Sequence, residues 1–251
     1  MDKLIENGIV VSIGSPKSDI ERSILLSLIA TCIHLKWRSK VRILVVDCYE
    51  QDGYLYKQRK RELEIVNNNF TTPFYLVNIS SEIFPYEVEF LRDEYDIIFI
   101  DLPSSLDQRD TIECYNLVDV LIVPTNMNSL DLLSTIDFLR RYKKTIIQTR
   151  ENIELKTAIY GLFSGLDLHD NDFHERNFEE FCKSLPIEFL QNFVPESETS
   201  TQRERATSFV SENFNYGNYE DLCKEILNKI ISGVGGLSVN ALDVVIEDEL
   251  I

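Results

Sequence analysis

The sequence predicts an α/β fold, a doubly wound and mostly parallel sheet of about seven strands with helices on both faces. Short runs of β-branched residues alternate with longer segments whose apolar residues recur at helical spacing. The short runs are almost continuously apolar, which is typical of parallel strands buried on both faces. The chain has 251 residues, of which 44% are hydrophobic, so it contains enough apolar material for one sizeable core.

Seven segments are expected to form strands, and six to form helices. The strand segments are 8–13, 42–46, 74–79, 96–100, 119–123, 157–163 and 189–194. The helical segments are 18–36, 54–66, 85–91, 129–147, 173–185 and 219–231. Helices between successive strands favour a parallel sheet. Because no internal repeat or linker interrupts the pattern, we expect a single domain over residues 1–236, followed by a frayed acidic tail at 237–251.

Composition narrows the classes of function. The chain carries 42 acidic and 25 basic residues, a net charge of −17, which disfavours general coating of nucleic acid unless basic groups gather locally. The 5 cysteines are scattered without CxxC spacing, so neither a disulfide framework nor a zinc site is indicated. No apolar run has the length of a membrane span and no secretory signal precedes the first strand, so we expect a soluble, cytoplasmic protein that binds no membrane.

Candidate chemistry lies at the carboxyl ends of the predicted strands, where open parallel sheets bind their ligands. The first strand leads through Gly14 and Lys17 into a helix, where a phosphate-binding loop would be expected. Asp47 ends the second strand and Asp101 ends the fourth. Two such carboxylates facing the first strand-to-helix turn are the usual surroundings of a magnesium nucleotide. Acidic residues also cap strand ends for purely structural reasons, so the pair alone does not distinguish a nucleotide site from a structural role.

The order of these segments resembles the ParA/MinD family of deviant-Walker P-loop ATPases, from Gly8 to Ile231. The resemblance rests on ILVVDCYEQ, YDIIFIDLP, VDVLIVPTNMNSLDLLSTIDFL, TAIYGLFSGLD and NFVPESETSTQRERA. The stretch VVDCYEQDGYLYKQRKREL is similar to TraA-type ParA-like proteins of conjugative elements. The resemblance implies ATP and Mg²⁺ as ligands and a homodimer, or a pair with an intact ParA-like ATPase, that acts on DNA or on a DNA-bound adaptor protein.

The resemblance also assigns roles to individual residues. Asp47 would orient water, and Asp101 would hold Mg²⁺ through the water shell of the ion. Arg203 and Arg205, which follow Pro195, would contact DNA. The residues expected to bind nucleotide are Gly14, Ser15, Lys17, Ser18, Ser164 and Pro195.

The phosphate loop departs from the family pattern, a deviant Walker A loop of the form K-G-G-x-G-K-[ST]-[ST]. The equivalent region holds one glycine, Gly14. Counting back from the helix places Glu21 at the phosphate lysine and Arg22 and Ser23 at the hydroxyl pair. Matching local letters instead aligns residues 14–18 (GSPKS) with G-x-G-K-S. A third interpretation, which we favour, is that Ser18, Asp19 and Glu21 only cap the helix, because carboxylates are favourable in its first turn.

These departures leave three hypotheses for function. The leading one is a ParA-like protein of plasmid partition or conjugative transfer whose nucleotide site is degenerate, with ATP hydrolysis impaired or absent, and which acts mainly by binding and positioning. The second is an active ATPase whose dimer is assembled by ATP, with Lys17 stabilising phosphate charge. The third is an interaction scaffold that binds neither nucleotide nor DNA.

Overall fold

The computed structural model describes residues 5–16, 19–37, 40–50, 53–65, 74–126, 129–166, 185, 187–195 and 219–233. Its strands are β1 (Ile9–Ile13), β2 (Ile43–Asp47), β3 (Tyr75–Asn78), β4 (Ile97–Asp101), β5 (Val120–Thr125), β6 (Ala158–Leu166), β7 (Glu188–Phe189) and β8 (Val194–Pro195). Its helices are α1 (Asp19–Trp37), α2 (Tyr54–Ile65), α3 (Phe84–Glu94), α4 (Arg109–Tyr115), α5 (Ser129–Tyr142), the π-helical turn η1 (Lys143–Ile147), α6 (Gln148–Glu151) and α9 (Glu220–Gly233).

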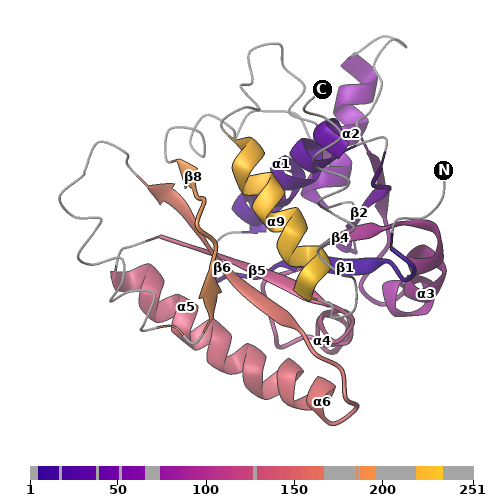
Figure 1. Ribbon diagram of the computed structural model, residues 1–251. Coiled ribbons are helices and arrows are strands. Elements are labelled where there is room, and N and C mark those ends of the chain that lie inside the picture. Colours follow the sequence, from indigo (N-terminus) through magenta and orange to yellow (C-terminus); the bar gives the residue numbers. More distant parts are fainter. Residues whose placement is uncertain are drawn as a thin grey trace.

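One sheet organises the chain, and its strand order is β3-β2-β4-β1-β5-β6-β7, with β8 also paired to β6. Every strand pairing among the described residues is parallel. β1 therefore lies in the middle of the sheet with β4 on one side and β5 on the other (Figure 1). The predicted doubly wound parallel α/β fold is confirmed.

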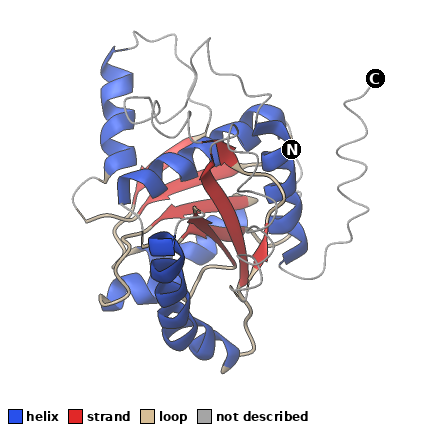
Figure 2. Cartoon of the chain, turned by 90° about the vertical axis from the view of Figure 1, so that its left-hand side faces the viewer, coloured by secondary structure: helices blue, strands red, loops and turns tan. Residues whose placement is uncertain are grey.

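Helices cover both faces of this sheet (Figure 2). One core joins α1, α9 and the start of α2 to the sheet, and the other joins α3, α4, α5 and η1 to the opposite face. Helix α1 contacts the sheet, α2 and α9, so most of its circumference is buried, and 13 of its 19 residues are buried. A helix enclosed in this way must be apolar nearly all round, which explains the long run of Ile and Leu in its sequence.

Three details differ from the sequence prediction. Helix α4 was not expected, because its seven residues RDTIECY show too short an apolar pattern. The expected strand at 189–194 is two separate strands of two residues each, β7 and β8. Ile20, Leu130 and Leu133 continue the apolar periodicity of their helices but are exposed. The expected helix at 173–185 lies outside the described residues, apart from Leu185.

At the amino end of β5, a partly buried carboxylate ties two helices to the sheet. Asp119 accepts a hydrogen bond from the Val10 backbone N–H at 3.0 Å. It also pairs with Arg92 of α3 at 2.7 Å and with Arg150 of α6 at 3.2 Å. Arg150 is only 2% exposed, so a buried guanidinium and that of Arg92 share the single carboxylate of Asp119 at this edge of the sheet.

Candidate nucleotide site at the carboxyl edge

The carboxyl ends of β1, β2 and β4 meet at one edge of the sheet. Asp47 and Asp101 are direct partners in the β2–β4 pairing, and both side chains are buried, at 0% and 2% exposure. The two carboxylates therefore lie on neighbouring strands, but only Asp101 contacts α1, whereas Asp47 binds backbone N–H groups between β2 and α2. Their local partners differ, and those partners determine what each carboxylate can do.

Asp101 faces the first turn of α1. Its Oδ2 accepts a hydrogen bond from Ser23 Oγ at 2.5 Å, and the same hydroxyl lies 2.9 Å from the Asp19 carbonyl oxygen. Burial raises the pKa of Asp101 to about 7, against the lowering effect of the Ser23 hydrogen bond, while neighbouring Asp47 raises it further and Arg22 lowers it. A serine of the first helical turn thus holds a carboxyl group that is half protonated near neutral pH.

Arg22 is the one group at this edge that carries a buried positive charge among the described residues, at 1% exposure. Its guanidinium pairs with the Asp19 carboxylate one helical turn earlier and donates to the Ile13 carbonyl oxygen at 3.4 Å. Asp19 in turn accepts from the Ser104 N–H at 3.2 Å. The interpretation of Asp19 as a simple helix cap is thus incomplete, because its carboxylate links Arg22 to the loop after β4.

Asp47 is engaged by backbone groups. One carboxylate oxygen accepts the Tyr49 N–H at 3.3 Å, and the other accepts the Tyr56 N–H in the first turn of α2 at 2.9 Å. A Cβ atom on Gly53 would lie 1.8 Å from Asp47 Oδ1, so the chain needs glycine there to let the carboxylate approach. Asp47 therefore caps the N-terminus of α2 from the end of β2.

Gly14 and Ser15 follow β1 and are held against β5. The Gly14 N–H donates to the Ile122 carbonyl oxygen at 3.0 Å, and Ser15 Oγ lies 3.4 Å from the Pro124 carbonyl oxygen. A Cβ atom on Gly14 would come within 2.8 Å of both Leu121 and Phe138. Close packing beneath β5 and α5 therefore accounts for this glycine. Lys17 and Ser18 lie outside the described residues.

The remaining predicted site residues lie elsewhere. Ser164 of β6 is 7% exposed and pairs with Val194, while Pro195 of β8 pairs with Leu166. Strand β5 separates β6 from β1 in the sheet, so these two positions are neighbours of each other and not of Asp101 in the strand order. Arg203 and Arg205 lie outside the described residues.

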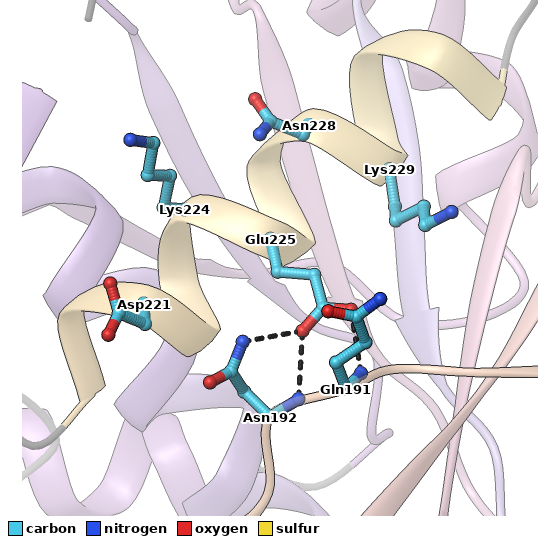
Figure 3. Close-up of a pocket in the computed structure, with 7 residues that line it drawn as sticks. All are labelled: Gln191, Asn192, Asp221, Lys224, Glu225, Asn228 and Lys229. Carbon is cyan, nitrogen blue, oxygen red and sulfur yellow. Dashed lines mark hydrogen bonds between the residues drawn. The ribbon is translucent and has the colours of Figure 1, made fainter.

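A hollow of about 480 Å³ lies between α9 and the β7–β8 loop, away from the carboxyl ends of β1, β2 and β4. Figure 3 shows Glu225 of α9 pointing toward the loop. Its carboxylate accepts the Gln191 N–H at 2.7 Å, the Asn192 N–H at 2.9 Å and Asn192 Nδ2 at 2.8 Å. Glu225 therefore fastens the loop to α9, and the hollow is lined by the polar residues Gln191, Asn192, Asp221, Lys224, Glu225, Asn228 and Lys229.

Solved structures share this architecture. A cobyrinic acid a,c-diamide synthase from Mycobacterium smegmatis with bound ATP analogue and magnesium aligns with a TM-score of 0.64 at 16% identity, covering 90% of this chain and 96% of that one. A candidate plasmid partition protein from Borrelia burgdorferi bound to AMPPNP aligns with a TM-score of 0.62 at 17% identity, covering 89% of this chain and 99% of that one. A chain of the MinC:MinD cell division protein complex of Aquifex aeolicus aligns with a TM-score of 0.61 at 14% identity, covering 88% of this chain and 96% of that one.

The chain has the fold of MinD and of ParA-like partition proteins. No protein-family model and no curated protein matches the sequence. At these identities the likeness establishes the fold, which agrees with the resemblance read from the motifs. In the described part of the chain, no helix combines the length and apolar character needed to cross a bilayer.

The residues at the carboxyl edge fit the metal ion of a magnesium nucleotide but not its phosphates. A serine hydroxyl beside a buried aspartate is the pair that holds Mg²⁺ in P-loop proteins, and Ser23 with Asp101 supplies it. The phosphate cradle does not fit among the described residues. The Gly14 N–H is already bound to β5, the Arg22 guanidinium is paired with Asp19, and Glu21 presents an exposed carboxylate on the first turn of α1.

Arg22 is the site residue that sequence reasoning underrated. The motif register places Arg22 at a hydroxyl position and assigns no role to its positive charge. Its position carries a signal, because Arg22, Leu26, Ile29 and Ile33 follow the helical spacing of one buried face. A buried charge at the head of such a series needs polar partners, and the Asp19 carboxylate and the Ile13 carbonyl oxygen supply them.

Proposed function

We propose that this chain is a ParA-like partition or conjugative-transfer factor that binds and positions its partners without hydrolysing ATP. The proposal rests on the fold shared with partition proteins and on the substitution of the phosphate site by the protein's own charges. It would act as a homodimer, or paired with an intact ParA-like ATPase, on DNA or on a DNA-bound adaptor protein. Arg203 and Arg205 are the proposed DNA contacts.

The observation that carries the proposal is the buried guanidinium of Arg22 at the start of α1, which is paired with the half-exposed carboxylate of Asp19. A phosphate site needs positive charge that is available to the ligand. Here the guanidinium is directed at Asp19 and at the Ile13 carbonyl oxygen. Asp47, the proposed water-orienting carboxylate, already accepts two backbone N–H groups, so its use in hydrolysis would require undoing the cap of α2.

A second candidate function, an active ATPase, is favoured by one observation, the Ser23–Asp101 hydrogen bond of 2.5 Å. This pair is what a magnesium-dependent phosphate site needs on the metal side. In this alternative Lys17 and Ser18 complete the cradle, Gly14 and Ser15 approach the phosphates, and Ser164 and Pro195 border the base.

Thermal unfolding with and without 5 mM ATP and Mg²⁺ separates the two functions. A site with a dissociation constant of about 50 µM would be about 99% filled and would stabilise the folded state by about 2.7 kcal/mol, which raises Tm by roughly 5–10 °C in a domain of this size. The proposal expects no such increase. A clear increase that disappears in Lys17→Ala would establish the ATPase alternative instead.

A gain-of-function variant provides the matched control. Glu21→Lys restores the lysine of the register that places Ser23 at a hydroxyl position, and the exposed side chain makes the change easy for the fold to accept. We expect this variant to acquire a thermal shift with ATP and Mg²⁺ that wild type lacks. The exposed Lys36→Glu change on the same helix should not. If Glu21→Lys shows no shift either, the carboxylate of Glu21 is not what prevents nucleotide binding, and the occupied Gly14 N–H and the Arg22–Asp19 pair remain as the reasons.

DNA binding is tested separately by retention on nonspecific duplex DNA at increasing salt. We expect weak retention that falls steeply with ionic strength, because phosphate contacts release counterions. Arg203→Ala/Arg205→Ala should lose it, with Arg140→Ala as a control at an exposed arginine that pairs with Asp137. Wild type that never binds DNA, alone or with an adaptor, would leave the scaffold hypothesis in its place.

A further inference from the structure

Helix α3 carries an exposed apolar stripe that its own fold does not use. Ile83, Tyr86 and Phe90 are 50%, 84% and 58% exposed, and they follow one another at i, i+3 and i+7. At about 100° per residue these three side chains lie within roughly 60° of one another on the helix surface. We refer to Ile83, Tyr86 and Phe90 as the α3 stripe.

The opposite side of the same helix holds it firmly in place. Phe84, Val88 and Leu91 are buried at 9% exposure or less and join the core on that face of the sheet. Figure 1 places α3 at one side of the molecule, away from α5 and α6. The stripe is therefore presented on a fixed helix, so a partner would bind it without first ordering it.

Acidic side chains border the stripe on both sides. The same helical spacing sets Glu87 and Glu94 along one border, and the other border consists of Glu82, Glu89 and Asp93. All five are exposed. The only basic residue of α3 is Arg92, and its guanidinium points inward to the Gly8 carbonyl oxygen at 2.5 Å. On the neighbouring α4, Arg109 is already paired with Glu113 at 2.8 Å.

We propose that the α3 stripe is the docking surface for a basic amphipathic helix of a partner protein. An apolar row between two acidic borders is complementary to a helix with an apolar face flanked by Lys and Arg. Nucleic acid and anionic membranes carry the wrong charge for this face. The acidic tail at 237–251 of this chain is likewise repelled. The surface is independent of the nucleotide site and of the function proposed above.

A second copy of this chain fits the surface less well. Its basic helix α2 exposes Lys57, Lys60 and Arg61, but Leu63 is the only large apolar side chain described as exposed on that helix. One leucine cannot cover a row of three apolar residues that spans two turns. Self-association through α2 is therefore an outcome that the experiment must detect, and it would contradict the choice of partner.

The test uses a fluorescein-labelled model peptide of 18 residues, with Leu along one helical face and Lys on the others, and measures its anisotropy as protein is added. We expect Tyr86→Ser/Phe90→Ser to weaken binding roughly 30-fold, as loss of a central aromatic contact does. Glu87→Lys/Glu94→Lys should weaken it roughly tenfold at low salt and less at high salt. These variants change exposed residues, and circular dichroism and Tm check that they fold.

Three comparisons decide the result. Ile153→Ser/Leu155→Ser removes exposed apolar side chains from the turn after α6 and should bind the peptide as wild type does. A peptide with Glu in place of Lys should not bind. If the α3 variants bind the basic peptide no more weakly than the control variant, the proposal is wrong. It is equally wrong if sedimentation shows a wild-type dimer that Tyr86→Ser/Phe90→Ser dissociates, because a second copy then occupies the stripe.

Discussion

Replacement of Arg22 by methionine gives the sharpest test of the internal charge at the carboxyl edge. Methionine keeps most of the length of the side chain but removes the guanidinium that faces Asp19, Asp101 and the Ile13 carbonyl oxygen. Removing one partner of a fully buried ion pair costs about 3–5 kcal/mol; because the Asp19 side chain is 43% exposed, we expect the lower end of this range, about 3 kcal/mol or less. For a domain of this size, 3 kcal/mol corresponds to a decrease in Tm of about 6–12 °C.

The effect should depend on pH, because Asp101 titrates near neutrality. Its pKa is raised from the ordinary 3.8 to about 7. The folded chain therefore binds the proton more tightly than the unfolded chain, and stability falls as pH rises from about 4 to 7, by up to about 4 kcal/mol. Above pH 7 this contribution is constant in wild type. Without Arg22 the pKa of Asp101 rises further, so the stability of Arg22→Met should continue to fall above pH 7.

The assay is urea unfolding of the nucleotide-free protein at pH 5.5 and pH 8.5, followed by the fluorescence of Trp37. This residue is the single tryptophan of the chain, and it is 3% exposed at the end of α1, so it reports on the helix that carries Arg22. Arg22→Met should lose more stability at pH 8.5 than at pH 5.5. In the Asp101→Asn background the same change should cost about 1–3 kcal/mol less.

One result would refute this reasoning. If Arg22→Met is as stable as wild type at pH 8.5, or more stable, the guanidinium does not serve as an internal counter-charge. A buried charge that lowers stability is typical of a group retained for a ligand. The proposal that the protein's own charges replace the phosphate site would then give way to the ATPase alternative.

Three further predictions concern the groups that shape this fold. Gly53→Ala should destabilise the chain by about 1–3 kcal/mol in urea unfolding, because the new Cβ displaces the Asp47 carboxylate from the end of α2. An unchanged urea midpoint would show that the close approach of Asp47 to residue 53 does not contribute to stability. Glu225→Gln should speed amide hydrogen exchange at Asn192 and lower Tm by only a few degrees, because it weakens three hydrogen bonds at the molecular surface. Exchange as slow as in wild type would show that this carboxylate does not hold the loop against α9. Asp119→Asn should lower Tm by about 6 °C or more, because it leaves two arginines of α3 and α6 without their shared carboxylate, and a Tm within 2 °C of wild type would count against it.

Most of the sheet could be predicted from sequence because its strands are buried on both faces. The strand at 96–100, for example, is expected from DIIFI and is observed as β4, every residue of which is buried. The segment at 189–194 has a similar apolar content but forms only β7 and β8, since both strands lie beyond β6 at the end of the sheet. Apolar content alone does not show how much of a neighbouring strand is available for pairing.

The sequence predicts where the candidate site lies, but not whether its two carboxylates are free or already hydrogen-bonded. Asp47 and Asp101 are placed together by strand order, which the sequence pattern supplies. Whether each carboxylate is free depends on the group that binds it: the Tyr56 N–H, nine residues along the chain, for Asp47, and the Ser23 hydroxyl, 78 residues away, for Asp101. Their sequence separations carry no periodic signal, so these hydrogen bonds could not be predicted.

By itself, the amino-acid sequence determined that this chain forms a parallel α/β sheet with acidic residues at the carboxyl ends of β2 and β4. Those features follow from local periodicity and from burial, which each segment expresses in its own residues. Only the tertiary structure decided that the Ser23 hydroxyl binds Asp101 and that the Ser104 N–H binds Asp19. It also decided that α3 leaves an apolar row in solvent. Each of these depends on which surfaces meet once the chain has folded, because the partner of a charge or of an apolar face is fixed by packing and not by neighbours in sequence.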